Sequence, residues 1–198
     1  MDSKIYYNLE RELKNALITP NKEGETILEK KILRAVINGT INNCSIYQEF
    51  EIDETRADIL AICEVEYYRK KSIEIHIIEL KRGDINMEAV GQVMNYKSQV
   101  EKYLERDEIL NHVSSSIPSK IVGHLIGSET SCFDDEYFSI MERLINTNQE
   151  LFVHQYNFNP HSGLEFESYG RCIAGETKAS SCMREVFENL GKRLIKEI

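Results

Sequence analysis

Two acidic residues and a lysine have the spacing expected for a chemical site on neighbouring strands. Glu79 and Lys81 lie at the end of an apolar run of strand length that begins at Ile75. Because strand side chains alternate between faces, residues two apart project from the same face of a sheet. Asp58 is a single acid within another apolar strand pattern, 21 residues before Glu79. Two acids on neighbouring strands could share one divalent cation, and half-buried charges are costly unless they serve each other or a ligand.

A helical pattern after the lysine adds two polar residues to this group. The segment from about Met87 to Arg106 has apolar residues at helical spacing. Within it Gln92 and Tyr96 are four residues apart, and residues with this spacing lie on one face of a helix. The sequence therefore predicts that both side chains lie on the same face of this helix.

The order Asp58, Glu79-Leu80-Lys81 and Gln92-x-x-x-Tyr96 resembles the PD-(D/E)xK nuclease superfamily. The likeness is closest to its RecB-like and NucS-like branches, in which a QxxxY helix follows the ExK strand. Ala57 stands where the proline of the superfamily's name would precede the acid. The resemblance covers about residues 24 to 126. It implies an α/β fold with a restriction-endonuclease-like core, a mixed sheet in the order α-β-β-β-α-β flanked by helices.

The resemblance also implies how the strand residues would act. Asp58, Glu79 and the backbone carbonyl of Leu80 would bind Mg²⁺ or Mn²⁺. This agrees with the preference of Mg²⁺ for oxygen ligands and for only one or two carboxylates. Lys81 would orient the attacking water or stabilise developing charge, and it could act as a base if its pKa fell beside the metal.

Other polar residues would position the helix or the substrate. Gln92 and Tyr96 are expected to hold the helix against the site or to hydrogen-bond the scissile strand. Lys97 and Arg82 are expected to contact phosphates. Arg56, two positions before the strand acid, is either another phosphate contact or a counter-charge for an acid.

In the resembling family a helix before the sheet often gives a further carboxylate to the metal. A helix is predicted to begin at Gly24-Glu25-Thr26 and to end near Ile37, before Asn38-Gly39. Glu25 lies nearer the centre of its expected buried face than Glu29 does, so Glu25 is the first candidate and Glu29 the second. The alternative is that an acid in the first turn only favours the helix dipole. The expected buried face consists of Leu28, Ile32, Ala35 and Val36.

The remaining pattern completes the expected order of elements. Further helices are predicted over residues 3–17, from 134 or 135 to 145, and over 180–198, and strands over 45–52, 56–65, 73–81, 120–126, 151–158 and 164–169. The chain is thus expected to be one domain, residues 1–198, with an extra N-terminal helix and a C-terminal α+β extension from about residue 130. Two glycines in the strand near residue 120, Gly123 and Gly127, indicate close approach of another segment or a bulge.

A basic hairpin with aromatic residues joins two of the predicted strands. Its sequence is Tyr67-Tyr68-Arg69-Lys70-Lys71. Such a segment could touch a phosphate backbone or stack on bases. We favour the simpler interpretation, a charged, solvated turn.

Composition limits the class of protein. The chain has 198 residues, 41% hydrophobic and 29% charged, which is typical of a globular domain. No apolar run has membrane-spanning length, and no signal peptide is expected from the start of the chain. The five cysteines are odd in number and lack CxxC spacing, so they are expected to be reduced in a cytoplasmic protein. The five histidines are scattered without HxH or HxxxH pairs, which argues against a histidine metal site.

The leading expectation is a Mg²⁺- or Mn²⁺-dependent deoxyribonuclease, acting in DNA repair, restriction or defence as relatives of the resembling family do. The formal net charge of −9 requires any DNA-binding surface to be a local basic patch. One alternative is a binding or assembly module that keeps the nuclease fold and cuts nothing alone. Another is an RNA-cleaving enzyme with the same residues. DNA is the expected partner, with a homodimer or a protein partner also compatible with the sequence, and no membrane is expected.

Overall fold

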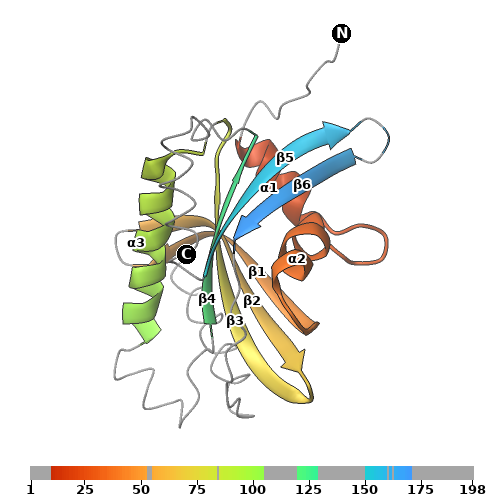
Figure 1. Ribbon diagram of the computed structural model, residues 1–198, viewed down its shortest axis with the longest axis vertical. Coiled ribbons are helices and arrows are strands. Elements are labelled where there is room, and N and C mark those ends of the chain that lie inside the picture. Colours follow the sequence, from red (N-terminus) through yellow and green to blue (C-terminus); the bar gives the residue numbers. More distant parts are fainter. Residues whose placement is uncertain are drawn as a thin grey trace.

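The computed structural model describes residues 10–52, 55–83, 85–104, 120–128, 150–159, 161 and 163–170. These residues form four helical segments and one six-stranded mixed sheet (Figure 1). The helical segments are α1 (Glu10–Ile18), the π-helical η1 (Leu28–Leu33), α2 (Arg34–Val36) and α3 (Met87–Leu104). The strands are β1 (Thr40–Ile52), β2 (Thr55–Tyr67), β3 (Lys70–Leu80), β4 (Lys120–Gly127), β5 (Leu151–Asn159) and β6 (Gly163–Gly170).

The strands lie side by side in the order in which they occur in the chain, from β1 to β6. β1, β2 and β3 form an antiparallel meander, β3 and β4 are parallel, β4 and β5 are parallel, and β6 returns antiparallel to β5. A parallel pair needs a crossover connection, and α3 lies in the chain between β3 and β4. The protein is therefore an α/β protein with a mixed sheet, as the sequence predicted.

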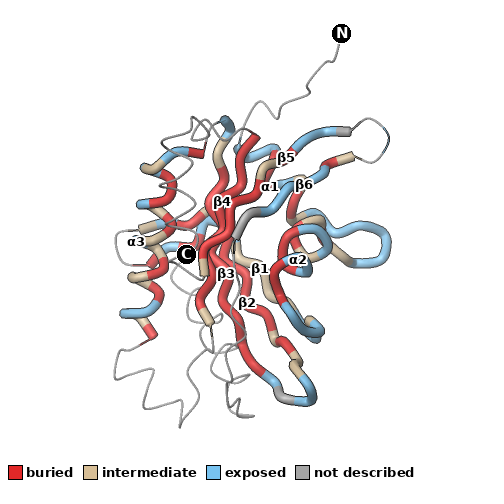
Figure 2. The backbone as a smooth tube through the Cα atoms, viewed as in Figure 1, coloured by how far each residue is buried: buried red, intermediate tan, exposed pale blue. Residues whose placement is uncertain are grey.

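Helices cover both faces of the sheet (Figure 1). On one face Val100 of α3 belongs to a core cluster with Ile77 of β3. On the other face Leu13 of α1 and Ile32 of η1 belong to a cluster with Ile78 of β3. The adjacent residues Ile77 and Ile78 thus face opposite layers, as strand alternation requires. The middle strands are buried along most of their length (Figure 2), because both of their faces are covered.

The two glycines of β4 allow neighbouring segments to approach closely, as the sequence indicated. A Cβ atom added at Gly123 would lie 2.5 Å from Cγ1 of Val93 on α3. One added at Gly127 would lie 2.8 Å from the carbonyl oxygen of Gly83, in the loop after β3. Both distances are well below van der Waals contact, so these glycines let α3 and the loop pack directly on β4.

The predicted strands are confirmed, with β1 beginning five residues earlier than expected. The helix expected from Gly24 instead begins at η1, after a turn in which Asn21 Oδ1 accepts hydrogen bonds from the backbone N–H groups of Glu23 and Glu25. Because η1 is π-helical, the expected helical register does not hold, and Leu33 is buried whereas Ala35 is exposed.

The C-terminal strands do not form a separate layer. β5 and β6 extend the sheet beyond the 24–126 core that the resemblance covers. The helices predicted over 134–145 and 180–198 lie outside the described residues, as do residues 3–9 of the predicted first helix. None of the helices in the described ranges has both the length and the apolar content that a membrane crossing requires.

Candidate active site

The structure brings Asp58 and Glu79 together on neighbouring strands. Ile59 of β2 pairs with Ile78 of β3, and the two acids occupy the next position on each strand. In an antiparallel pair, residues at opposed positions project from the same face. Asp58 Oδ2 also accepts a hydrogen bond of 2.9 Å from the backbone N–H of Leu80, which ties the acid to the end of β3.

Lys81 joins the acids to helix α3. Its Nζ donates to Oε1 of Glu79 at 2.9 Å and to Oε1 of Gln92 at 2.7 Å. Burial alone would lower the pKa of Lys81, but the hydrogen bond and charge of Glu79, together with the charges of Glu10 and Asp58, outweigh burial and raise it. Lys81 is therefore held as a charged donor at neutral pH, which suits orientation and charge stabilisation rather than proton abstraction.

Both acids are held in an environment that disfavours their charged form. Burial is the largest cause and raises the pKa of Asp58, while the hydrogen bond from Leu80 opposes it. Burial likewise raises the pKa of Glu79, and the charge of Asp58 raises it further against the opposing effect of Lys81. When both carboxyl groups ionise, they form a local excess of negative charge that a bound cation would relieve.

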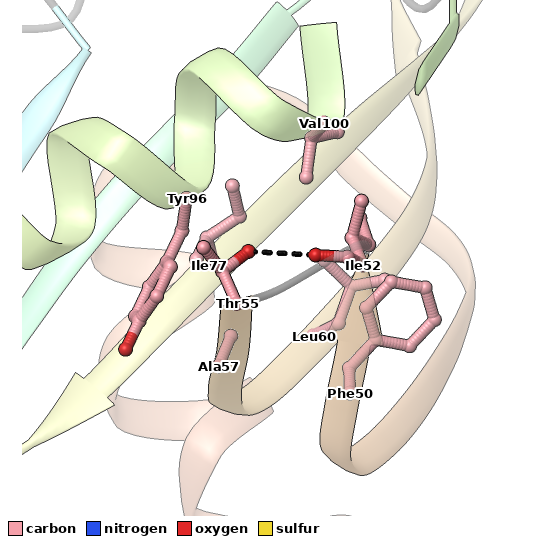
Figure 3. Close-up of a pocket in the computed structure, with 8 residues that line it drawn as sticks. All are labelled: Phe50, Ile52, Thr55, Ala57, Leu60, Ile77, Tyr96 and Val100. Atoms are coloured by element: carbon pink, nitrogen blue, oxygen red, sulfur yellow. Dashed lines mark hydrogen bonds between the residues drawn. The ribbon is translucent and has the colours of Figure 1, made fainter. Parts of the chain in front are cut away.

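Tyr96 lies close enough to the acids for their charges to act on it. Burial raises the pKa of Tyr96, and the charges of Glu79 and Asp58 add to this. Its ring also lines a small, open apolar hollow between α3 and the sheet (Figure 3). The hollow is lined by Phe50, Ile52, Thr55, Ala57, Leu60, Ile77, Tyr96 and Val100. It offers apolar surface and no charged group.

Helix α1 adds a carboxylate and an ammonium group that the sequence did not lead us to expect. Oε1 of Glu10 accepts a hydrogen bond of 3.2 Å from the backbone N–H of Arg82, just after β3. The charge of Glu10 raises the pKa of Asp58, whereas the charge of Lys14 lowers it. The missed signal was that Glu10 lies three residues before the buried Leu13, on the apolar stripe of the helix.

The expected helix carboxylates lie elsewhere. Glu25 precedes the helix instead of lying in its first turn, and it forms an ion pair with Arg34. Glu29 Oε2 accepts hydrogen bonds from the N–H and the hydroxyl group of Thr26, at 3.0 and 2.8 Å. This is a capping interaction at the start of the helix. The structure therefore does not bring Glu25 or Glu29 to the pair of acids, and Glu10 is the helical acid that reaches it.

Two of the expected phosphate contacts have protein partners instead. Lys97 is buried, and its Nζ donates to Oε2 of Glu150 at 2.7 Å, so it is not available to a ligand. Arg56 Nε lies 3.1 Å from Oε2 of Glu49, which makes it the counter-charge of an acid. Arg82 is exposed and follows the end of β3, and its contact with a phosphate stays a prediction.

The residues fit a hard divalent cation that retains water. Among the described residues no group of three or more His, Cys, Asp or Glu side chains converges as a complete metal cage. Mg²⁺ does not need one, because it usually binds through one or two carboxylates and keeps several waters. Asp58 and Glu79 supply that number, with the Leu80 carbonyl as the further oxygen that the resemblance implies.

A second polar cluster lies on the opposite face of the sheet, and sequence spacing did not reveal it. Three buried histidines form a hydrogen-bonded chain across β3, β4 and β5. His76 Nδ1 lies 2.9 Å from His124 Nε2, and His124 Nδ1 lies 2.9 Å from His154 Nε2. His154 Nδ1 lies 2.7 Å from Oγ of Ser168 on β6. The three rings bond to one another in a line, although their positions in the sequence show no spacing pattern.

No protein family matches the chain, and no curated protein matches it. Assignment of a function therefore depends on residue types and on the geometry described above.

Proposed function

We propose that the protein is a metal-dependent phosphodiesterase that acts on DNA. The observation that carries this proposal is the convergence of Asp58, Glu79, Lys81 and Gln92 from β2, β3 and α3. These are the residue types that phosphodiester hydrolysis with a hard cation requires. The parallel β3–β4 pair joined through α3, after an antiparallel meander, supports the finer assignment of a restriction-endonuclease-like core.

Each residue has a role that follows from its position. Asp58 and Glu79 would hold Mg²⁺ or Mn²⁺ with the carbonyl oxygen of Leu80. When bound, such an ion neutralises charge on the phosphoryl oxygens and makes water more acidic. Lys81, kept charged by Glu79, would donate to the negative charge that develops during bond cleavage. Gln92 holds Lys81 in position through its 2.7 Å hydrogen bond.

Two further residues border the site. Glu10 adds negative charge from α1 and strengthens the attraction for a cation. Tyr96 borders the apolar hollow (Figure 3) and lies within range of the charges of the acids, so its partly exposed ring could contact a sugar or base. In this arrangement the scissile phosphate would lie at the acids, with its nucleoside toward α3.

The test is cleavage of circular, linear and single-stranded DNA by the purified protein with Mg²⁺, Mn²⁺ or EDTA. Cleavage should require the metal, and D58A and K81A should each lose about 10²–10³-fold in rate, the range for loss of an electrostatic group at a reacting centre. R34A is the control for loss of a basic side chain, because Arg34 pairs with Glu25 and not with the site. Equal loss in R34A and K81A would contradict the proposed role of Lys81.

The net charge of −9 favours a second candidate, a binding or assembly module on the same fold. That candidate predicts that neither DNA nor RNA is cut with any metal. Cleavage of RNA with DNA spared would instead support the RNA-cleaving alternative.

A further inference from the structure

Two cysteines lie opposite each other on the first two strands. Cys44 of β1 pairs in register with Cys63 of β2. Their Sγ atoms are 3.2 Å apart. Cys63 is fully buried in the core cluster between the sheet and the helices α1 and η1, and Cys44 is partly exposed. β1 is the edge strand of the described sheet, so no further described strand lies beside it on its outer side.

The backbone already satisfies what a disulfide requires. Directly opposed residues in an antiparallel pair have Cα atoms about 4.5–5.5 Å apart, and disulfides need roughly 4.4–6.8 Å. The sulfurs would have to approach by about 1.1 Å to reach the S–S bond length of about 2.05 Å. A small rotation of each side chain is enough, and no strand has to move.

We propose that Cys44 and Cys63 are a thiol-oxidation site that forms a reversible cross-strand disulfide when the protein meets a hydroperoxide. This inference is independent of the proposed nuclease activity. It adds a covalent link between the edge strand β1 and β2, the strand that carries Asp58.

The reaction takes two steps. The sulfur of Cys44, the partly exposed residue of the pair, attacks one peroxide oxygen, so that the O–O bond breaks and a sulfenic acid and one water result. The sulfur of Cys63 then attacks the sulfur of Cys44. The S–O bond breaks, and hydroxide leaves with the Cys63 proton as a second water. Two thiols are oxidised to a disulfide, and one hydroperoxide, here hydrogen peroxide, is reduced to two waters.

The environment of Cys63 sets the order and the rate. The hydrogen bond with Cys44 and burial both raise the pKa of the Cys63 thiol. Cys63 is therefore the second sulfur to react, and closure of the disulfide should be slow at neutral pH and faster as pH rises.

The test uses the full chain treated with hydrogen peroxide, alkylated and digested with trypsin without reduction. Residues 35–56 and 57–69 form adjacent tryptic peptides, each with one of the two cysteines. We expect a joined species with the summed mass of both peptides less two hydrogens, which disappears after treatment with a reductant. The oxidised protein should also unfold at a higher temperature, because the link closes a 19-residue separation in the chain.

Two variants make the result specific. C44S should abolish the joined species and leave the Cys63 thiol free for alkylation. C63S should leave Cys44 as a sulfenic acid that reacts with dimedone. If C44S does not fold under reducing conditions, C44A replaces it.

Three results would overturn the proposal. One is that both cysteines of the wild-type chain remain free at peroxide concentrations that oxidise other thiols. Another is that Cys63 joins Cys132, Cys172 or Cys182 as readily as Cys44, since a mixture of links would mean that the opposed position confers no preference. The third is that C63S gives no sulfenic acid at Cys44.

Discussion

The central feature at the scale of residues is a pair of acids whose environment opposes their own charge. Asp58 and Glu79 occupy opposed positions on β2 and β3, and burial raises the pKa of each. A raised pKa in the folded state means that the folded protein holds the proton more tightly than the unfolded chain does. Stability contributed by that proton is lost as pH rises through the folded-state pKa, so at neutral pH the raised pKa of each acid destabilises the metal-free fold.

This predicts that D58N stabilises the protein in EDTA. Removal of one buried charge should raise the unfolding temperature, by about 2–4 °C for each kcal/mol gained in a domain of this size. The amide oxygen of asparagine can still accept the hydrogen bond from Leu80. The same variant should lose the stabilisation that wild-type protein gains from added Mg²⁺.

The measurement is thermal unfolding of wild-type protein and D58N, each in EDTA and in Mg²⁺. E64Q is the control, because Glu64 lies on the same strand but pairs with Lys71. A lower unfolding temperature of D58N in EDTA, or an unchanged response to Mg²⁺, would be inconsistent with the assignment of Asp58.

At the scale of elements, the histidine chain links four strands by side chains. Burial lowers the pKa of His76 and His124 and lowers that of His154 to about 3. At one end Nε2 of His76 lies 3.5 Å from Oε2 of Glu74. Burial raises the pKa of Glu74, but His76, Lys120 and Tyr67 together lower it below its ordinary value. A charged Glu74 favours a proton on Nε2 of every ring, so that each Nδ1 accepts and Ser168 donates.

The burial of these three histidines predicts that the protein loses stability in mild acid. The unfolded chain takes up protons on its histidines near pH 6.5, whereas the buried rings do not. Stability is therefore complete above about pH 6.5 and falls below it, by up to about 1.4 kcal/mol per pH unit for each histidine. Equilibrium unfolding by urea between pH 5 and 8 measures this slope.

Two variants distinguish the contribution of the three buried histidines from that of other titrating groups. H154F keeps an aromatic ring in the stack with His124 but cannot take up a proton, so the slope should become shallower even though the variant is less stable at pH 8. H161Q, at an exposed histidine, should leave the slope unchanged. Equal slopes in wild type and H154F would rule out the buried histidines as the source of the pH dependence.

The β2–β3 hairpin is strained at its tip. Tyr68 is fully exposed and has φ of 45°, and Arg69 has φ of 68°. Left-handed backbone costs roughly 1–2 kcal/mol for a residue with a side chain, while glycine loses about 0.5–1 kcal/mol through greater chain entropy. R69G should therefore stabilise the protein by about 1 kcal/mol or less, measured by urea unfolding.

The control R69A removes the same charge but keeps the strain, so it should not stabilise. Destabilisation by R69G would contradict the strained conformation. The DNA affinity of both variants then distinguishes the two interpretations of the hairpin. Unchanged affinity supports a solvated turn, and weakened affinity in both variants supports a contact with the phosphate backbone.

The elements that could be predicted are those whose residues follow a local apolar or helical pattern. β2, β3 and β4 follow from apolar runs, and α3 follows from helical spacing, so Asp58, Glu79, Lys81 and Gln92 could be identified together. The start of β1 was missed because Asn42 and Asn43 are exposed polar residues beside a register shift. Local pattern does not mark an irregular edge strand of this kind.

Contacts between residues far apart in the chain could not be predicted. His76 and His124 are 48 positions apart, and only the register of parallel strands brings them together. Glu10 reaches the end of β3 across 72 positions. Glu25 was chosen on the assumption of a regular helix from residue 24. That assumption was wrong, because Glu25 lies in the turn before η1.

At the scale of the whole molecule, net charge opposes the proposed substrate. With a formal charge of −9 the chain should bind DNA weakly in EDTA, through a local basic surface, and the binding should fall steeply with salt. Fluorescence anisotropy of labelled duplex DNA between about 50 and 200 mM salt checks this, because counterion release is easily measured over that range. Tight binding that is insensitive to salt would contradict the expectation.

The most direct test of the account is the single-turnover rate of DNA cleavage by E79Q in saturating Mn²⁺, compared with wild type and E64Q. Glu79 and Glu64 are both carboxylates on the antiparallel meander, and each has a lysine partner. Glu79 alone of the two lies beside Asp58 and the lysine held by α3. The account predicts a loss of about 10²–10³-fold in E79Q and an almost unchanged rate in E64Q. Cleavage by E79Q at the wild-type rate would contradict it.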